Sequence, residues 1–236
     1  MFLRKTLALI VAGIFVCGAA AGVAQEADDA TAYGVWLAAS QASDVPKAIE
    51  AAEGYLAKFP SGAYADFIKK WLSQNRLSAL DTAIKAKDMT GMIAAGRAIL
   101  AHDPENLNVL YAIAFNLRVR ELFASPQNFG HAPEAKEFAQ KAVALVEGGK
   151  TLTGVENFDK NATLAWLYQV LAAVEANGGG TVEAIKLYEK SSTLAPDDVA
   201  IKGRNLLSVI GLQQAAYSEA AKAFNALPEA DRTAAE

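Results

Sequence analysis

The stretch from Leu164 to Pro196 constrains the fold most strongly, because it contains two helical patterns separated by a break. Residues 164–177 are apolar at helical spacing, three glycines follow at 178–180, and residues 181–195 form an amphipathic pattern that ends at a proline. Glycine and proline are the weakest helix formers, so they mark the ends of helices. The stretch therefore predicts two helices joined by a tight turn.

The rest of the chain also favours helices over strands. Hydrophobic residues make up 53% of the 236 positions, alanine is prominent among them, and only seven prolines occur. Alanine loses no side-chain entropy in a helix, and no runs of alternating valine and isoleucine suggest strands. An all-α fold is therefore expected.

The helical stretch carries a spaced set of residues that recurs along the chain. Its members are Tyr168, Leu171, Ala172, Ala184, Tyr188, Ser191 and Pro196. The intervals of four, seven and twelve residues that follow Ala184 recur after Ala48 and after Met92. This pattern resembles the tetratricopeptide repeat (TPR), and the segment FPSGAYADFIKKWL at 59–72 is similar to TPR segments of bacterial envelope proteins. The resemblance implies an α-solenoid that binds other molecules.

Turn residues divide the expected repeat domain, residues 31–228, into about five antiparallel helix pairs. The pairs end at Pro60, Pro104, Gly148–Gly149, Pro196 and Pro228, and a polar tail follows at 229–236. Among the expected helices are one over 63–87 with a break near 73–75, a buried helix over 106–123, one over 197–213 and a last one that begins at Ser218.

The first 24 residues have the pattern of a secretory signal peptide. Arg4 and Lys5 precede an apolar run at 7–16, and small residues at 22–24 fit a cleavage site before Gln25. Residues 25–30 are then a flexible lead-in. Cleavage after residues 19–21 and an uncleaved anchor are the alternatives. The expected location is periplasmic or secreted.

Cys17, the single cysteine, raises the alternative of a lipid anchor. The bulky residues at 14–16 argue against it, because a lipidation site normally has a small residue before the cysteine. A signal peptide or a lipidated Cys17 is the only membrane contact expected. After cleavage no cysteine remains, which excludes disulfides and thiol chemistry from the mature chain.

Charge and motifs give no indication of an enzyme or of nucleic-acid binding. The net charge is −4, and it becomes −6 without Arg4 and Lys5. Phosphate binding needs clustered basic residues, which are absent. His102 and His131 have no metal-binding spacing, and neither a phosphate loop nor a Gly-x-Ser-x-Gly elbow occurs. No catalytic residue, metal or cofactor is predicted.

The expected solenoid would bind a protein or peptide on its inner helices. The candidate contact residues are Tyr111, Asn116, Arg118, Arg120, Trp166 and Tyr168. The alternatives are that the aromatic residues belong to the core between helices and that the two arginines are a solvated pair at a helix end. Some TPR proteins hold a terminal carboxylate with lysine and asparagine, but the matching inner positions here are mostly apolar.

The function predicted from these features is an exported adaptor for protein–protein interaction in the bacterial cell envelope. A structural subunit of an envelope assembly is the alternative, and a helical protein that binds a small ligand is a third interpretation. The pattern defines no oligomeric state.

Overall fold

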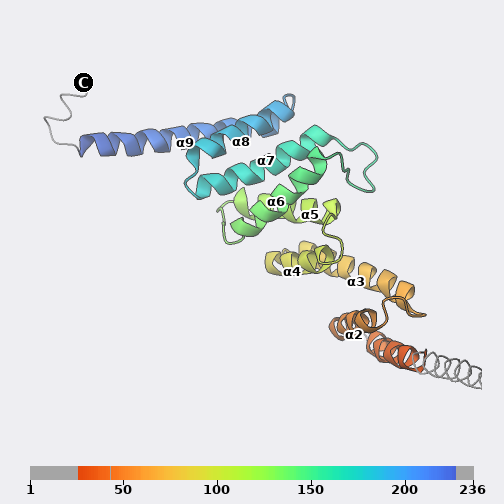
Figure 1. The fold of residues 1–236 in the computed structure, drawn as a ribbon. Coiled ribbons are helices and arrows are strands. Elements are labelled where there is room, and N and C mark those ends of the chain that lie inside the picture. Colours follow the sequence, from red (N-terminus) through yellow and green to blue (C-terminus); the bar gives the residue numbers. More distant parts are fainter. Residues whose placement is uncertain (1–25, 43, 227–236) are drawn as a thin grey trace, which may run out of the picture. The chain divides into compact units, whose positions relative to one another are not determined.

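The computed structural model describes residues 26–42 and 44–226, which are helical with connecting turns and contain no strand (Figure 1). The chain divides into two compact units, residues 1–79 and 80–236. No helix in the described ranges is long and apolar enough to cross a membrane. The predicted signal peptide, Cys17, Gln25, Pro228 and the predicted polar tail lie outside the described residues.

The first unit contains helical residues 26–41, α2 (Val45–Lys58) and the first part of α3 (Ala65–Ala86). Its core is built around Trp36, Tyr55, Ile68 and Leu72. α2 begins directly after Asp44, because the Asp44 carboxylate accepts a hydrogen bond from the Lys47 amide.

Residues 26–30, where the sequence predicts a flexible lead-in, are helical in the structure. The physical reason is the buried carboxylate of Asp29, which accepts a hydrogen bond from the Tyr55 hydroxyl and, at 2.8 Å, another from the Ala63 amide. These bonds join the first helix to α2 and to the turn that follows it.

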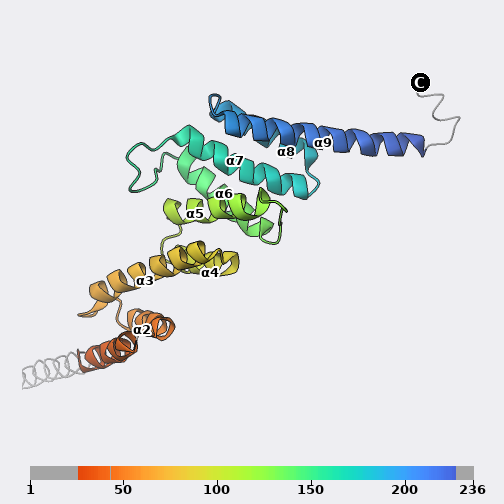
Figure 2. The ribbon, with the colours of Figure 1, turned by 180° about the vertical axis from the view of Figure 1, so that it is seen from behind.

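The second unit contains the end of α3 and six further helices (Figure 2). These are α4 (Met89–Leu100), α5 (Leu107–Leu117), α6 (Ala132–Glu147), α7 (Lys160–Asn177), α8 (Thr181–Leu194) and α9 (Val199–Asn225), and a π-helical segment, η1 (Arg118–Leu122), continues α5. From α4 onward each helix packs against the next, and α7 also contacts α5 and α9. Thus α5, α7 and α9 lie in one layer.

Side-chain caps fix where these helices begin. The residues before α4, α5, α7 and α9 are Asp88, Asn106, Asp159 and Asp198. Each side chain accepts a hydrogen bond from the amide three residues later, which supplies a partner for a free N–H of the first turn.

The glycine triplet forms the predicted turn between α7 and α8. Gly179 has φ +83°, a conformation that is unfavourable for a residue with a Cβ atom. The amide of Gly180 donates to the carbonyl of Glu175 at 2.8 Å, so the last carbonyls of α7 have partners.

The structure corrects three predicted boundaries. α3 is continuous, without the break near 73–75. The buried helix predicted over 106–123 is α-helical only to Leu117 and then widens into η1. Residues 199–225 form one helix, because no glycine or proline interrupts 212–225, and Ser218 lies within it. The predicted fifth pair is therefore a single long helix.

The close contact between α4 and α5 depends on Gly96, which is buried in α4. A Cβ atom at this position would lie 2.1 Å from Cδ1 of Ile113, itself fully buried in α5. Gly96 therefore allows α4 and α5 to approach closely.

We expect Gly96→Ala to lower the free energy of unfolding by about 1–3 kcal/mol, because Ile113 must move from its packed position. Gly211→Ala is the matched control, since Gly211 is in α9 of the same unit and a Cβ atom added there would have no other atom within 4 Å. The control should gain about 0.5–1 kcal/mol from better helix propensity. Urea unfolding followed by circular dichroism measures the free energy of unfolding of both variants. Equal changes in the two variants would contradict the close approach of α4 and α5.

Candidate functional site

The half-buried side of α5 and α7 carries a continuous row of aromatic rings. Tyr111 stacks on Phe115 with ring centroids 5.8 Å apart, and Phe115 meets the edge of Trp166 at 6.4 Å. Both distances are in the range of favourable aromatic pairs. Although the sequence suggested a buried helix here, the structure leaves one side of α5 accessible.

Arg118, the first residue of η1, places its guanidinium among these rings. Its central carbon lies 3.8 Å from the centroid of Trp166 and 5.3 Å from that of Phe123. Arg204 of α9 approaches the same Phe123 ring at 5.4 Å. We define Tyr111, Phe115, Arg118, Phe123, Trp166 and Arg204 as the aromatic–arginine cluster.

The guanidinium of Arg118 is almost completely buried, with 2% of the residue exposed. Its Nε and Nη2 donate hydrogen bonds to Oε1 of Gln169 at 3.0 and 2.6 Å. Within the described ranges no acidic side chain forms an ion pair with it. Neutral oxygen and aromatic faces therefore surround this charge.

Burial lowers the pKa of Arg118 from its ordinary value of 12.5 to about 9, and the positive charge of Arg204 adds to the shift. The group still carries its proton at neutral pH. The cluster therefore presents two positive charges beside aromatic rings, one of them largely removed from water.

A buried chain of polar side chains holds the guanidinium in place. Gln169 is fully buried in α7, and its Nε2 donates to Oδ1 of Asn205 in α9 at 2.5 Å. Nδ2 of Asn205 lies 3.0 Å from the hydroxyls of both Ser191 and Ser192 in α8. The network thus joins η1, α7, α8 and α9, and each member limits the rotation of the next.

The other end of η1 is held separately. The buried carboxylate of Glu121 lies 2.9 Å, through Oε1, from Nδ1 of His131. Nε2 of His131 is 3.3 Å from the hydroxyl of Thr90 in α4. These contacts connect η1 to α4 and to the start of α6, so the segment that carries Arg118 is held at both ends.

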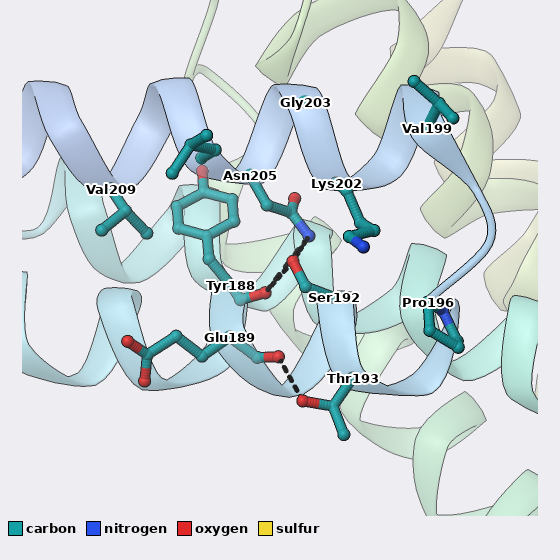
Figure 3. Close-up of a pocket in the computed structure, with 11 residues that line it drawn as sticks. Tyr188, Glu189, Ser192, Thr193, Pro196, Val199, Lys202, Gly203, Asn205 and Val209 are labelled. Atoms are coloured by element: carbon teal, nitrogen blue, oxygen red, sulfur yellow. Dashed lines mark hydrogen bonds between the residues drawn. The ribbon is translucent and has the colours of Figure 1, made fainter.

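A cavity of about 610 Å³ lies between α8 and α9, next to this network (Figure 3). Its lining includes Tyr188, Ser192, Lys202, Asn205 and Leu206. In the close-up Asn205 reaches from α9 toward α8, where Nδ2 is bonded to the carbonyl of Tyr188 at 3.2 Å (Figure 3). Asn205 therefore belongs both to the cavity wall and to the network behind Arg118.

Three of the six sequence-predicted contact residues come together in the cluster, namely Tyr111, Arg118 and Trp166. The alternative interpretation, in which Arg118 is solvated, is wrong, because η1 directs it into the aromatic rings.

The other three predicted residues lie elsewhere. Tyr168 donates a hydrogen bond to Glu147 of α6 at 2.7 Å. Arg120 donates to the carbonyl of Ile84, and Asn116 donates to the carbonyl of Ala112 in its own helix.

Sequence reasoning missed three members of the cluster. Phe115 follows Tyr111 by four residues, so helical spacing could have identified it. Phe123 and Arg204 had no such signal, because their approach depends on η1 and on the packing of α9 against α7.

No protein-family model matches this sequence, and no significant match to a curated protein was found.

We expect Gln169→Met to lower the free energy of unfolding by about 3 kcal/mol or more, since it leaves the Arg118 guanidinium and the Asn205 carbonyl without their partners. Asn116→Ala, which removes a bond within one helix, should cost less than about 1 kcal/mol. Trp166 is the only tryptophan in residues 80–236. The ¹⁹F signal of 5-fluorotryptophan at this position reports urea unfolding of the second unit, and equal losses would argue against the network.

The contact between Tyr168 and Glu147 makes the stability of the protein depend on pH. The hydrogen bond from Tyr168 holds the pKa of Glu147 below its ordinary value of 4.5, and the charge of Lys190 acts in the same direction. Because the pKa of Glu147 is lower in the folded state than in the unfolded state, the ionised carboxylate stabilises the fold above about pH 4.5. This stabilisation is lost as the pH falls through the pKa of Glu147 in the folded state.

We therefore expect Tyr168→Phe to flatten the decrease in thermal midpoint between about pH 6 and pH 3, because the largest cause of the shift is removed. Tyr217→Phe, which changes a residue that is 78% exposed on α9, should leave that decrease unchanged. An unchanged profile in the Tyr168 variant would contradict the assignment.

Proposed function

We propose that this protein is an exported TPR-like adaptor that binds a peptide segment of another cell-envelope protein on the layer formed by α5, α7 and α9. The observation that carries the proposal is the aromatic–arginine cluster. Tyrosine, tryptophan and arginine are the residues that most often dominate binding energy at protein interfaces. Here all three types occur within one half-buried patch on three helices.

The arrangement suits an extended or helical peptide. The ring row follows α5 and crosses to α7 through Phe115 and Trp166, which gives a partner apolar contacts along a line. The cluster is also rigid, because Gln169 and Asn205 fix Arg118 from behind. A preorganised surface loses little side-chain entropy on binding. The export signal and the TPR pattern of the sequence support the proposed envelope location and the solenoid architecture.

A second candidate function, a structural subunit of an envelope assembly, is favoured by α9. Leu207 and Tyr217 on this helix are 72% and 78% exposed. Large exposed apolar residues are common at permanent interfaces. The third interpretation, a small-ligand-binding helical protein, is supported by the cavity between α8 and α9.

Two matched tyrosine substitutions test the first two proposals against each other. Residues 25–236, tagged at the C-terminus, are incubated with the envelope fraction, cross-linked and recovered. We expect Tyr111→Ala to reduce the recovered partner about tenfold, since a tyrosine at the centre of an interface contributes on the order of 1–2 kcal/mol.

Tyr217→Ala removes the same side chain from α9, outside the cluster, and should leave recovery unchanged. Loss of the partner in the Tyr217 variant alone would instead favour the structural-subunit function. Equal recovery with both variants would show that neither surface is the contact.

A further inference from the structure

The aromatic–arginine cluster contains a charge imbalance that the described part of the chain does not correct. The guanidinium groups of Arg118 and Arg204 lie 5.3 and 5.4 Å from the centroid of the same ring, Phe123. Like charges that approach in a partly dry site repel one another, and buried charges in proteins are normally paired. Each of the two arginines is without an acidic ion-pair partner in the described ranges.

We infer that Arg118 and Arg204 bind a carboxylate of the partner peptide, with Trp166 and Phe123 as its apolar walls. The inference rests on the proposed function, and it specifies the chemical group that the peptide must carry.

The hydrogen bonds of Arg118 use only two of the three guanidinium nitrogens. Nε and Nη2 both donate to Oε1 of Gln169, whereas Nη1 donates to no group within the described ranges. Gln169 is a neutral acceptor, so it orients the guanidinium without neutralising it. Because Asn205 holds Gln169 in turn, the free nitrogen has a fixed direction before a ligand arrives.

Arg204 supplies the second contact from solvent. It is exposed on α9, so its side chain can follow an incoming group, whereas Arg118 is held between Trp166 and Phe123. The rings exclude water from one side, which strengthens the attraction between a guanidinium and an anion. A cationic ligand would meet two positive charges, and a neutral one would leave them unbalanced.

Asp198, an acidic residue that acts electrostatically on Arg118, does not replace the proposed ligand. Asp198 attracts Arg118 electrostatically, but its carboxylate accepts the hydrogen bond of the Ile201 amide at 2.9 Å and caps α9. In an unmodified peptide the only anionic groups at neutral pH are carboxylates, at the chain end and on aspartate and glutamate. The proposed function therefore selects a carboxylate.

The test uses a pool of random eight-residue peptides as the probe, one half with free C-terminal carboxylates and one half with amides. Residues 25–236 capture peptides from the pool. Mass spectrometry then counts the captured peptides with a carboxylate end, those with an amide end, and the aspartate and glutamate residues in each group. We expect captured peptides to be enriched about tenfold or more in the free chain end or, if a side chain is the source, in aspartate and glutamate.

Arg204→Gln should abolish this enrichment. Lys202→Gln is the matched control, because it removes one positive charge from the same helix but lines the cavity between α8 and α9. It should retain the enrichment. Both residues are exposed, so neither change threatens the fold.

The possible results separate the two proposals. Capture of peptides without a preference for carboxylates supports peptide binding and overturns the carboxylate site. Equal loss of the carboxylate enrichment in the Arg204 and Lys202 variants also overturns the carboxylate site. If no peptide is captured, the proposed function fails, and acetate and inorganic phosphate then test the anion site alone. A shift of the Arg118 Nε–H NMR signal with acetate that disappears in Arg204→Gln supports the site. A shift with phosphate only, or no shift, overturns it.

Discussion

The hydrogen bonds between the Arg118 guanidinium and the side chain of Gln169 are the interaction on which the candidate site depends. A buried positive charge is costly unless polar groups or a counter-charge stabilise it. Here one amide oxygen accepts two of its N–H groups, and the Trp166 ring covers its face at 3.8 Å. This arrangement keeps the charge in place and still leaves it unneutralised, which is the condition that a binding site for an anion requires.

The π-helical segment explains why the arginine can occupy this position. A regular continuation of α5 would advance each residue by a constant angle, whereas η1 changes that angle at Arg118. π-helical turns are rare and occur frequently at functional sites. The segment is held through Gln169 at its start and through Glu121 and His131 near its end, so the irregular backbone is supported by side chains from α4, α6 and α7.

The sequence predicted the features that depend on local chemistry. The glycines at 178–180 mark the end of a helix because their effect acts within one turn. The sequence analysis predicted Arg118 and Trp166 as candidate contact residues, with a solvated Arg118 as the alternative. Local spacing cannot reveal η1, nor the pairing of Gln169 with Asn205, which lie 36 residues apart. The cluster therefore depends on tertiary packing, which local spacing does not determine.

Asn205 links the aromatic–arginine cluster to the cavity between α8 and α9. On one side its Oδ1 accepts the Gln169 bond that orients Arg118; on the other, the residue lines the cavity between α8 and α9. Because Nδ2 is also bonded to the carbonyl of Tyr188, a change in the distance between α8 and α9 would displace this amide. Gln169 would then lose its fixed orientation, and the Arg118 guanidinium would lose its fixed orientation as well. The spacing of these two helices is therefore part of the proposed binding site, although neither helix contributes a ring to it.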